Sequence, residues 1–175
     1  MSTQHTDKTR VFTFVREFDA PKNLVFNAFS NAGALNEWWG PAESANSVIS
    51  LDFRPGGIFH FKMDFSGHIS YGRFLFKKIE PYDLLEFTNA FADEQAGVVK
   101  APFDIPFPLE IFYRLIFTEN NGRTTITLTG QPVNASSEEI ESFHSITGSM
   151  EQGFGGTFDK LSVYLKDDHP FSPSR

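Results

Sequence analysis

The sequence predicts an α+β fold in which a curved antiparallel sheet is wrapped around one long C-terminal helix. Two observations predict it. Segments with alternating apolar residues follow one another and are joined by hairpin-type connections, and strands joined in this way pair antiparallel. The last apolar stripe, from Ile140 to Leu165, stays within a narrow sector at about 100° per residue, which is typical of an amphipathic helix. One such helix on one such sheet is an α+β arrangement.

The first strand and two short helices are predicted between residues 11 and 38. Residues 11–18 alternate between apolar and polar positions. Asp19 is the expected cap of the first short helix, and Pro21 fits its first turn. Ser30 or Asn31 is the expected cap of the second, which runs through to Trp38.

Six further strands complete a predicted sheet of seven. The sequence R-P-G-G at 54–57 and the sequence E-N-N-G at 119–122 are typical of hairpin turns, because proline presets φ and glycine accepts a positive φ. The long connection 91–108 contains three prolines, and it is equally consistent with a lid and with a solvated excursion. The predicted strands are 47–53, 58–65, 68–79, 84–90, 109–118 and 123–130.

The length suits one domain. We place it at residues 9–165 of the 175, between polar or proline-broken tails at 1–8 and 166–175. His5 and His169 fall in these tails and receive no role.

Charge and composition argue against several classes of function. The net charge is −7 and the basic residues do not cluster, so we expect no nucleic-acid partner. No apolar run is long enough to span a membrane and no secretory signal begins the sequence, so we expect a cytoplasmic protein without a membrane partner. The chain has no cysteine, no metal-binding motif and no glycine-rich phosphate loop, so we expect no metal and no cofactor.

Phenylalanine is the unusual component, with 21 Phe against 4 Tyr and 2 Trp. A phenylalanine ring has no polar group, so this excess indicates much aromatic area held away from water, in a core or around an apolar cavity. In the strand 58–65, the residues Phe59, Phe61, Met63 and Phe65 share one face, which we predict to be the inward one.

Four motifs in order resemble one known family. They are N-E-W-W-G-P at 36–41, D-F-R-P-G-G at 52–57, I-E-P-Y-D-L-L-E-F-T at 79–88, and the closing stretch 150–165, which has Gly153-Phe154 where the family usually has Gly-Trp. The chain is similar to the helix-grip proteins of the START-related (SRPBCC) superfamily. Within them, it resembles the branch named for the activator of the ninety-kilodalton heat-shock protein's ATPase.

This resemblance implies a seven-stranded sheet that grips the C-terminal helix, and a pocket between them that holds apolar ligands in many relatives. Those relatives include lipid carriers, hormone receptors, aromatase/cyclases and co-chaperone domains. We expect a single domain, without the additional N-terminal domain through which the eukaryotic activator engages its chaperone, so the resemblance gives little support to a chaperone partner. Whether the chain forms a homodimer is left open.

The leading hypothesis is that a small apolar or aromatic ligand binds between the sheet and the closing helix. One alternative is a cyclase or hydrolase in which Glu151, His144 or Tyr71 provides acid/base chemistry; another is a protein-binding module. We favour binding over catalysis and name no catalytic residue. The residues expected to form the cavity are Trp38, Trp39, Phe59, Phe61, Met63, Tyr71, Phe87, His144, Thr147, Met150, Glu151 and Phe154.

Overall fold

The structure, a computed structural model, describes residues 11–166. The proposed tail 1–8 and residues 167–175 lie outside the described residues. Lys166, which was placed in the C-terminal tail, is the last residue of a helix. The elements are β1 (Phe12–Phe18), α2 (Lys22–Asn27), α3 (Ala32–Trp38), β2 (Ala45–Leu51), β3 (Ile58–Phe65), β4 (His68–Glu80), β5 (Leu84–Ala92), β6 (Val98–Val99), β7 (Glu110–Asn120), β8 (Arg123–Val133), α4 (Ser137–Ser145) and α5 (Thr147–Lys166).

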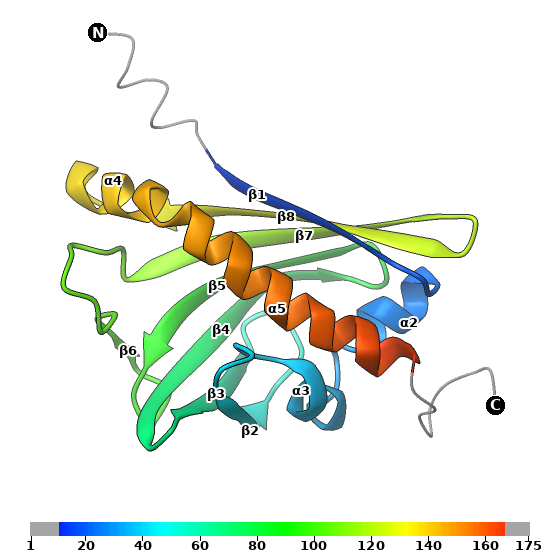
Figure 1. Ribbon diagram of the computed structural model, residues 1–175, viewed down its shortest axis with the longest axis horizontal. Helices are drawn as coiled ribbons and strands as arrows, with labels where there is room; N and C mark the ends of the chain where they lie inside the picture. The colour runs from blue at the N-terminus through cyan, green and yellow to red at the C-terminus, as the bar shows by residue number, and fades with distance from the viewer. Residues whose placement is uncertain (1–10, 167–175) are drawn as a thin grey trace, which may run out of the picture.

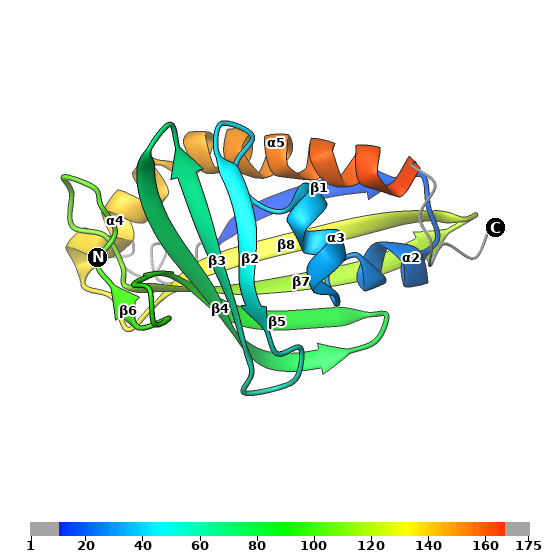
Figure 2. The same cartoon turned by 90° about the horizontal axis from the view of Figure 1, so that it is seen from below.

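The strands form one curved antiparallel sheet. Its order is β1-β8-β7-β5-β4-β3-β2, and the short strand β6 pairs with β5 as an eighth member. The concave face holds α5, which crosses the sheet diagonally (Figure 1). Seen at right angles, α3 lies between β2 and α5 (Figure 2). The predicted α+β fold, with a curved antiparallel sheet around a C-terminal helix, is therefore confirmed, and β6 is the strand that the sequence pattern missed.

The C-terminal helix is divided in two, which corrects the prediction of one continuous helix. Ile146 separates α4 from α5 with φ −111° and ψ 15°. On either side, the Ser145 hydroxyl donates to the Ser142 carbonyl at 2.7 Å and the Thr147 hydroxyl donates to the His144 carbonyl at 3.2 Å. Such side-chain bonds compete with the helical backbone pattern. Ile140 and Phe143 of the predicted stripe therefore belong to α4, and its residues from Met150 onwards belong to α5.

The helix start predicted at Ser30 or Asn31 is confirmed at Asn31, and the one predicted at Asp19 is wrong. Ser136 and Glu139 form a reciprocal capping box at α4, and the Asn31 side chain accepts from the Ala34 N–H at 2.7 Å at α3. At α2, however, Pro21 occupies the cap position and no side chain caps the helix. Asp19 lies in the bend after β1 and pairs instead with the Arg123 guanidinium of β8 at 3.3 Å.

Trp38 is the centre of the packing between the short helices and α5. Its side chain is fully buried, and its indole N–H donates to the Ala28 carbonyl at 2.9 Å. The ring centroids of Phe29 and Phe158 lie 4.8 and 6.1 Å from that of Trp38. This one residue thus joins α2, α3 and α5.

The free edge of the sheet at β2 is irregular. The pairing of β2 with β3 shifts register between Val48 and Ser50, which marks a β-bulge. The backbone N–H of Val48 donates to the Asn36 side-chain oxygen at 2.8 Å. A side chain from α3 therefore occupies a hydrogen-bonding position at this edge.

Thr88 carries a buried hydroxyl on the outer face of the sheet. It lies on β5 between Leu75 and Phe112, and its hydroxyl is buried with no hydrogen-bond partner among residues 11–166. An unpaired buried hydroxyl costs about 1–3 kcal/mol. We expect Thr88→Val, which keeps the shape, to raise the free energy of unfolding by about 1 kcal/mol in urea titrations. A loss of stability would show that the hydroxyl is satisfied.

Candidate functional site

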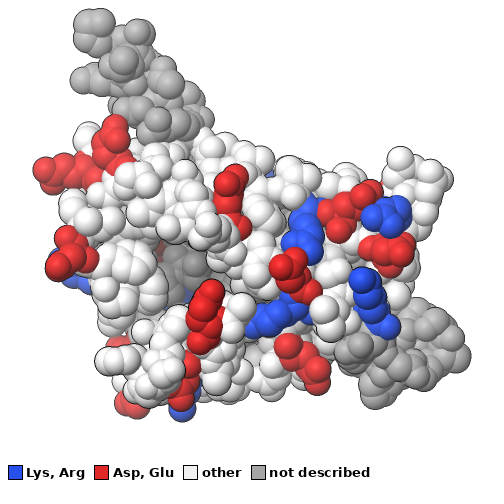
Figure 3. Space-filling view, in the orientation of Figure 1, with Lys and Arg blue, Asp and Glu red and all other residues white. Residues whose placement is uncertain are grey.

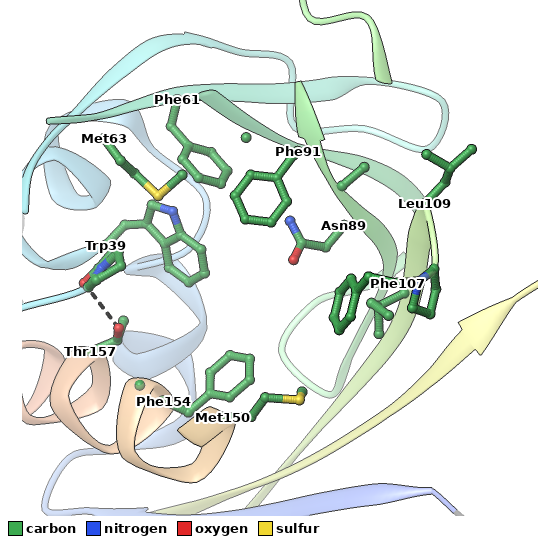
Figure 4. A pocket seen from close by; sticks show the side chains of 17 residues that line it. Trp39, Phe61, Met63, Asn89, Phe91, Phe107, Leu109, Met150, Phe154 and Thr157 are labelled. Carbon is green, nitrogen blue, oxygen red and sulfur yellow. Dashed lines mark hydrogen bonds between the residues drawn. The ribbon is translucent and has the colours of Figure 1, made fainter. Parts of the chain in front are cut away.

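A pocket of about 240 Å³ lies between the concave face of the sheet and the N-terminal half of α5. Figure 3 shows a hollow on this face of the molecule, in a region where most of the surface is neither acidic nor basic. The walls come from the turn after α3, from β3, β4 and β5, from the segment before β7 and the start of β7, and from α5 (Figure 4). The lining residues are Trp39, Gly40, Pro41, Phe61, Met63, Gly72, Asn89, Ala90, Phe91, Phe107, Pro108, Leu109, Ile111, Met150, Gly153, Phe154 and Thr157.

Aromatic rings form the floor of the pocket. Phe61 and Met63 point inward because they alternate on β3 with residues of the outer face. Trp39 follows the end of α3, and its ring meets those of Phe61 and Phe74 edge-on, with centroids 5.5 and 5.0 Å apart. On the other side of the pocket, the Phe154 side chain extends from α5 (Figure 4). The rings of Trp39, Phe61 and Phe74 contact one another and so hold each other in place.

The long connection between β5 and β7 forms one side of the pocket. A chain of ring contacts attaches it: Phe91 to Phe103 at 5.6 Å, Phe103 to Phe107 at 5.1 Å, and Phe107 to Phe143 of α4 at 6.3 Å. Phe107 and the two residues after it line the pocket, whereas Phe103 is 44% exposed. Part of this segment is therefore a wall of the pocket and part is surface.

Few polar side chains reach the pocket, and no lining residue in the described part of the chain is titratable. Thr157 donates its hydroxyl proton to the Gly40 carbonyl at 3.0 Å. Asn89 donates from its side-chain nitrogen to the Arg73 carbonyl at 3.1 Å. The indole nitrogen of Trp39 is buried and has no hydrogen-bond partner among residues 11–166. The walls are therefore apolar and uncharged, with isolated neutral polar groups.

Residues 19–166 match the protein family described as "Activator of Hsp90 ATPase homolog 1-like protein". The chain belongs to this family. The predicted resemblance is confirmed, since the match covers most of the chain and the structure has the helix-grip arrangement. No curated protein gives a significant sequence match.

Solved structures with the same fold come from several bacteria. A protein from Mycobacterium smegmatis shares 24% identity, with a TM-score of 0.73 over 93% of this chain and 94% of that one. A protein from Arthrobacter aurescens also shares 24% identity, with a TM-score of 0.75 over 95% and 94%. A third, from Staphylococcus epidermidis, shares 23% identity, with a TM-score of 0.71 over 93% and 94%. At this level of identity the likeness establishes the fold alone.

Within this Hsp90-activator-like domain, five of the predicted cavity residues line the pocket: Trp39, Phe61, Met63, Met150 and Phe154. Two others lie next to it. Phe87 lines a smaller adjoining space of about 20 Å³, and Phe59 is buried against the Trp39 ring, 6.1 Å away. Period-two alternation placed Phe59, Phe61 and Met63 of β3 correctly, because alternate residues of a strand share one face.

Trp38 does not line the pocket, which corrects its assignment. Adjacent residues on a helix point about 100° apart, so Trp38 and Trp39 cannot share a direction. Trp38 takes the inward one and is fully buried. Trp39 leaves the helix as its C-terminal cap, with an extended backbone at ψ 145°, and faces the pocket.

Tyr71 lies on the opposite face of the sheet from the pocket. It pairs with Lys62, whereas its neighbour Gly72 faces inward and lines the pocket. The Tyr71 hydroxyl donates to the Glu94 carboxylate at 3.3 Å, and its ring lies 5.8 Å from that of His60. A change of one residue in a strand moves the side chain to the other face, and Tyr71 was assigned to the wrong face.

The expected polar end of the pocket, formed by His144, Thr147 and Glu151, is not found there. Glu151 is exposed, and His144 lies on α4 with its ring 5.2 Å from that of Phe143. None of the three lines the pocket. The helical spacing that grouped them assumed one continuous helix, and the break at Ile146 removes that relation. Glu151, His144 and Tyr71 therefore do not meet at a common point in the pocket.

The sequence prediction missed several residues of the pocket, above all Asn89 and Phe91 of β5 and the segment 107–109. The first two had a signal, because Phe87, Asn89 and Phe91 alternate along one strand and so share its inward face. The segment 107–109 belongs to an irregular connection and has no periodicity from which its direction follows.

The described part of the chain contains neither a candidate metal site nor a helix suited to span a membrane. Residues 11–166 contain no group of three or more His, Cys, Asp or Glu side chains placed to hold an ion. None of the helices in this range is both long and apolar enough to cross a bilayer.

Proposed function

We propose that this protein binds a small apolar or aromatic molecule in the pocket between its sheet and α5. The observation that supports this most is the open space of about 240 Å³ surrounded by aromatic and methionine side chains. Ligand sites in proteins are typically concave, mostly apolar and furnished with a few polar groups. A core that packed these rings against α5 would have left no such space.

The size of the pocket limits the ligand. An engineered apolar cavity of about 150 Å³ in another protein accommodates benzene, which has six carbon atoms. In proportion, a space of about 240 Å³ accommodates about ten non-hydrogen atoms. This corresponds to a molecule with one substituted ring or two fused rings.

The chemistry of the walls supports binding rather than catalysis. General acid/base catalysis requires a titratable group within hydrogen-bond reach of the substrate. The described lining residues include none, and the carboxylate of Glu151 lies at the surface. The pocket is therefore suited to holding a molecule and excluding water from it.

Isothermal titration calorimetry with 2-naphthol at pH 7 tests the proposal. We expect one binding site with a negative heat-capacity change, because apolar surface is buried. Met150→Trp adds a large side chain to the pocket and is expected to weaken this binding several-fold. Val163→Trp is the matched control, because Val163 lies on the same helix, is exposed and is not a lining residue.

Equal affinities for the two tryptophan variants would place the binding elsewhere. The absence of binding by naphthalene and its derivatives altogether would contradict the proposal. Where the probes do bind, native mass spectrometry of the protein purified from its own host identifies the natural ligand, as a co-purifying mass that Met150→Trp releases and Val163→Trp retains.

A further inference from the structure

We propose that Asn89 selects the ligand, and that the pocket prefers uncharged molecules that carry a hydroxyl or N–H donor. This inference rests on the proposed binding function and narrows its ligand class. Asn89 is the polar side chain on the sheet wall of the pocket, and it also lines the smaller adjoining space. It projects between the rings of Phe91 and Phe107 (Figure 4).

The orientation of the Asn89 carboxamide is fixed by its partner. Its nitrogen donates to the backbone carbonyl of Arg73 at 3.1 Å. A carbonyl only accepts hydrogen bonds, so the group that faces it must be the NH₂ end of the amide. The oxygen is therefore at the other end, and Figure 4 shows it directed into the pocket.

The Asn89 oxygen has no donor among residues 11–166. It stands among apolar side chains, where an unpaired acceptor is costly unless a water or ligand satisfies it. A bound molecule that displaces water from the pocket without supplying a donor leaves this oxygen unpaired. One that supplies an O–H or N–H at this point satisfies it.

Thr157, the second polar side chain on the wall, also favours a ligand that donates a hydrogen bond. Thr157 has one hydroxyl proton, and it is donated to the Gly40 carbonyl at 3.0 Å, so towards a ligand the hydroxyl can only accept. The indole N–H of Trp39 is fully buried. The side chains around the pocket thus offer acceptors at two points, and beside them only the second N–H of the Asn89 amide as a donor.

The charge of the ligand follows from the same walls. The described lining residues include no Lys, Arg or His, so a carboxylate would enter without a neutralising partner. Removing an unpaired charge from water is far more costly than removing a hydroxyl. The preferred ligand is therefore neutral, such as a phenol, an alcohol or a nitrogen heterocycle with an N–H.

Four probes of one ring system test the inference by calorimetry: 2-naphthol, which has a donor; 2-methoxynaphthalene, which has only an acceptor; naphthalene; and 2-naphthoate. We expect 2-naphthol to bind most tightly and 2-naphthoate to bind too weakly to detect. In Asn89→Leu, we expect the preference for 2-naphthol over naphthalene to fall about tenfold, the value of one hydrogen bond. Thr88→Val, on the other face of the same strand, should leave that preference unchanged.

The possible results separate the two proposals. If all the neutral probes bind equally and Asn89→Leu changes nothing, selection by Asn89 is refuted while ligand binding stands. If 2-naphthoate binds as tightly as 2-naphthol, the preference for uncharged molecules is wrong. If no probe binds, both proposals fail. If Asn89→Leu still binds naphthalene, its pocket is intact. If the variant does not fold, the preference for a donor is tested by the ratio of the wild-type affinities for 2-naphthol and 2-methoxynaphthalene.

Discussion

Trp38→Ala is expected to lower the free energy of unfolding by about 4 kcal/mol, a large fraction of the stability of an ordinary domain. The side chain is fully buried and packs against Phe29 and Phe158, so its removal leaves a large cavity at the junction of three helices. The Ala28 carbonyl also loses its hydrogen bond from the indole. Urea titration followed by far-UV circular dichroism measures the change.

Trp38→Phe is a milder change, because it keeps an aromatic ring and removes the N–H donor but only part of the volume. We expect it to cost clearly less than the alanine variant. A cost below about 1 kcal/mol for Trp38→Ala would mean that the helices rearrange to fill the space, contrary to the packing described above.

Gly72→Ala is expected to weaken the binding of 2-naphthol about tenfold or more and to destabilise the fold by about 1–3 kcal/mol. A Cβ atom on Gly72 would lie 2.5 Å from the end of the Phe61 ring. Phe61 lines the pocket, so its ring has space to move only on that side, and the pocket becomes smaller. Calorimetry and urea titration measure the two effects.

Gly130→Ala is the matched control for this experiment. A Cβ atom there would lie 2.5 Å from the Tyr113 ring, the same kind of clash between paired residues of neighbouring strands. Tyr113 does not line the main pocket, and its burial raises the pKa of its phenol, so the ring stays neutral. We expect a similar loss of stability with little loss of binding. Equal losses of affinity in the two variants would contradict a specific role for Phe61.

The strand-built half of the site could be predicted from the sequence, because alternation along β3 fixes which side chains face α5. Phe61 and Met63 follow from that pattern, and Trp39 follows from the end of its helix. The same rule, applied to β5, would have found Asn89. The information was present in the sequence at each of these positions.

The rest could not be predicted, for two physical reasons. The grouping of His144 with Glu151 depends on an unbroken helix, and the apolar spacing of residues 140–165 does not mark the break at Ile146. Phe107 reaches the pocket from an irregular segment that has no periodic pattern. Its ring contacts Phe103 in the same segment and Phe143, which is distant in sequence. The position of Phe107 therefore depends on tertiary contacts that the local sequence pattern does not show.

The irregular edge at β2 bears on how the protein behaves at high concentration. A regular edge strand presents a row of free backbone groups to which the edge of another molecule can add. Here the bulge after Val48 interrupts that row, and Asn36 already accepts one of its N–H groups. Strand addition would have to break this bond and remove the bulge. The domain therefore has a built-in obstacle to sheet-to-sheet aggregation, at the edge strand farthest in the sheet from β1.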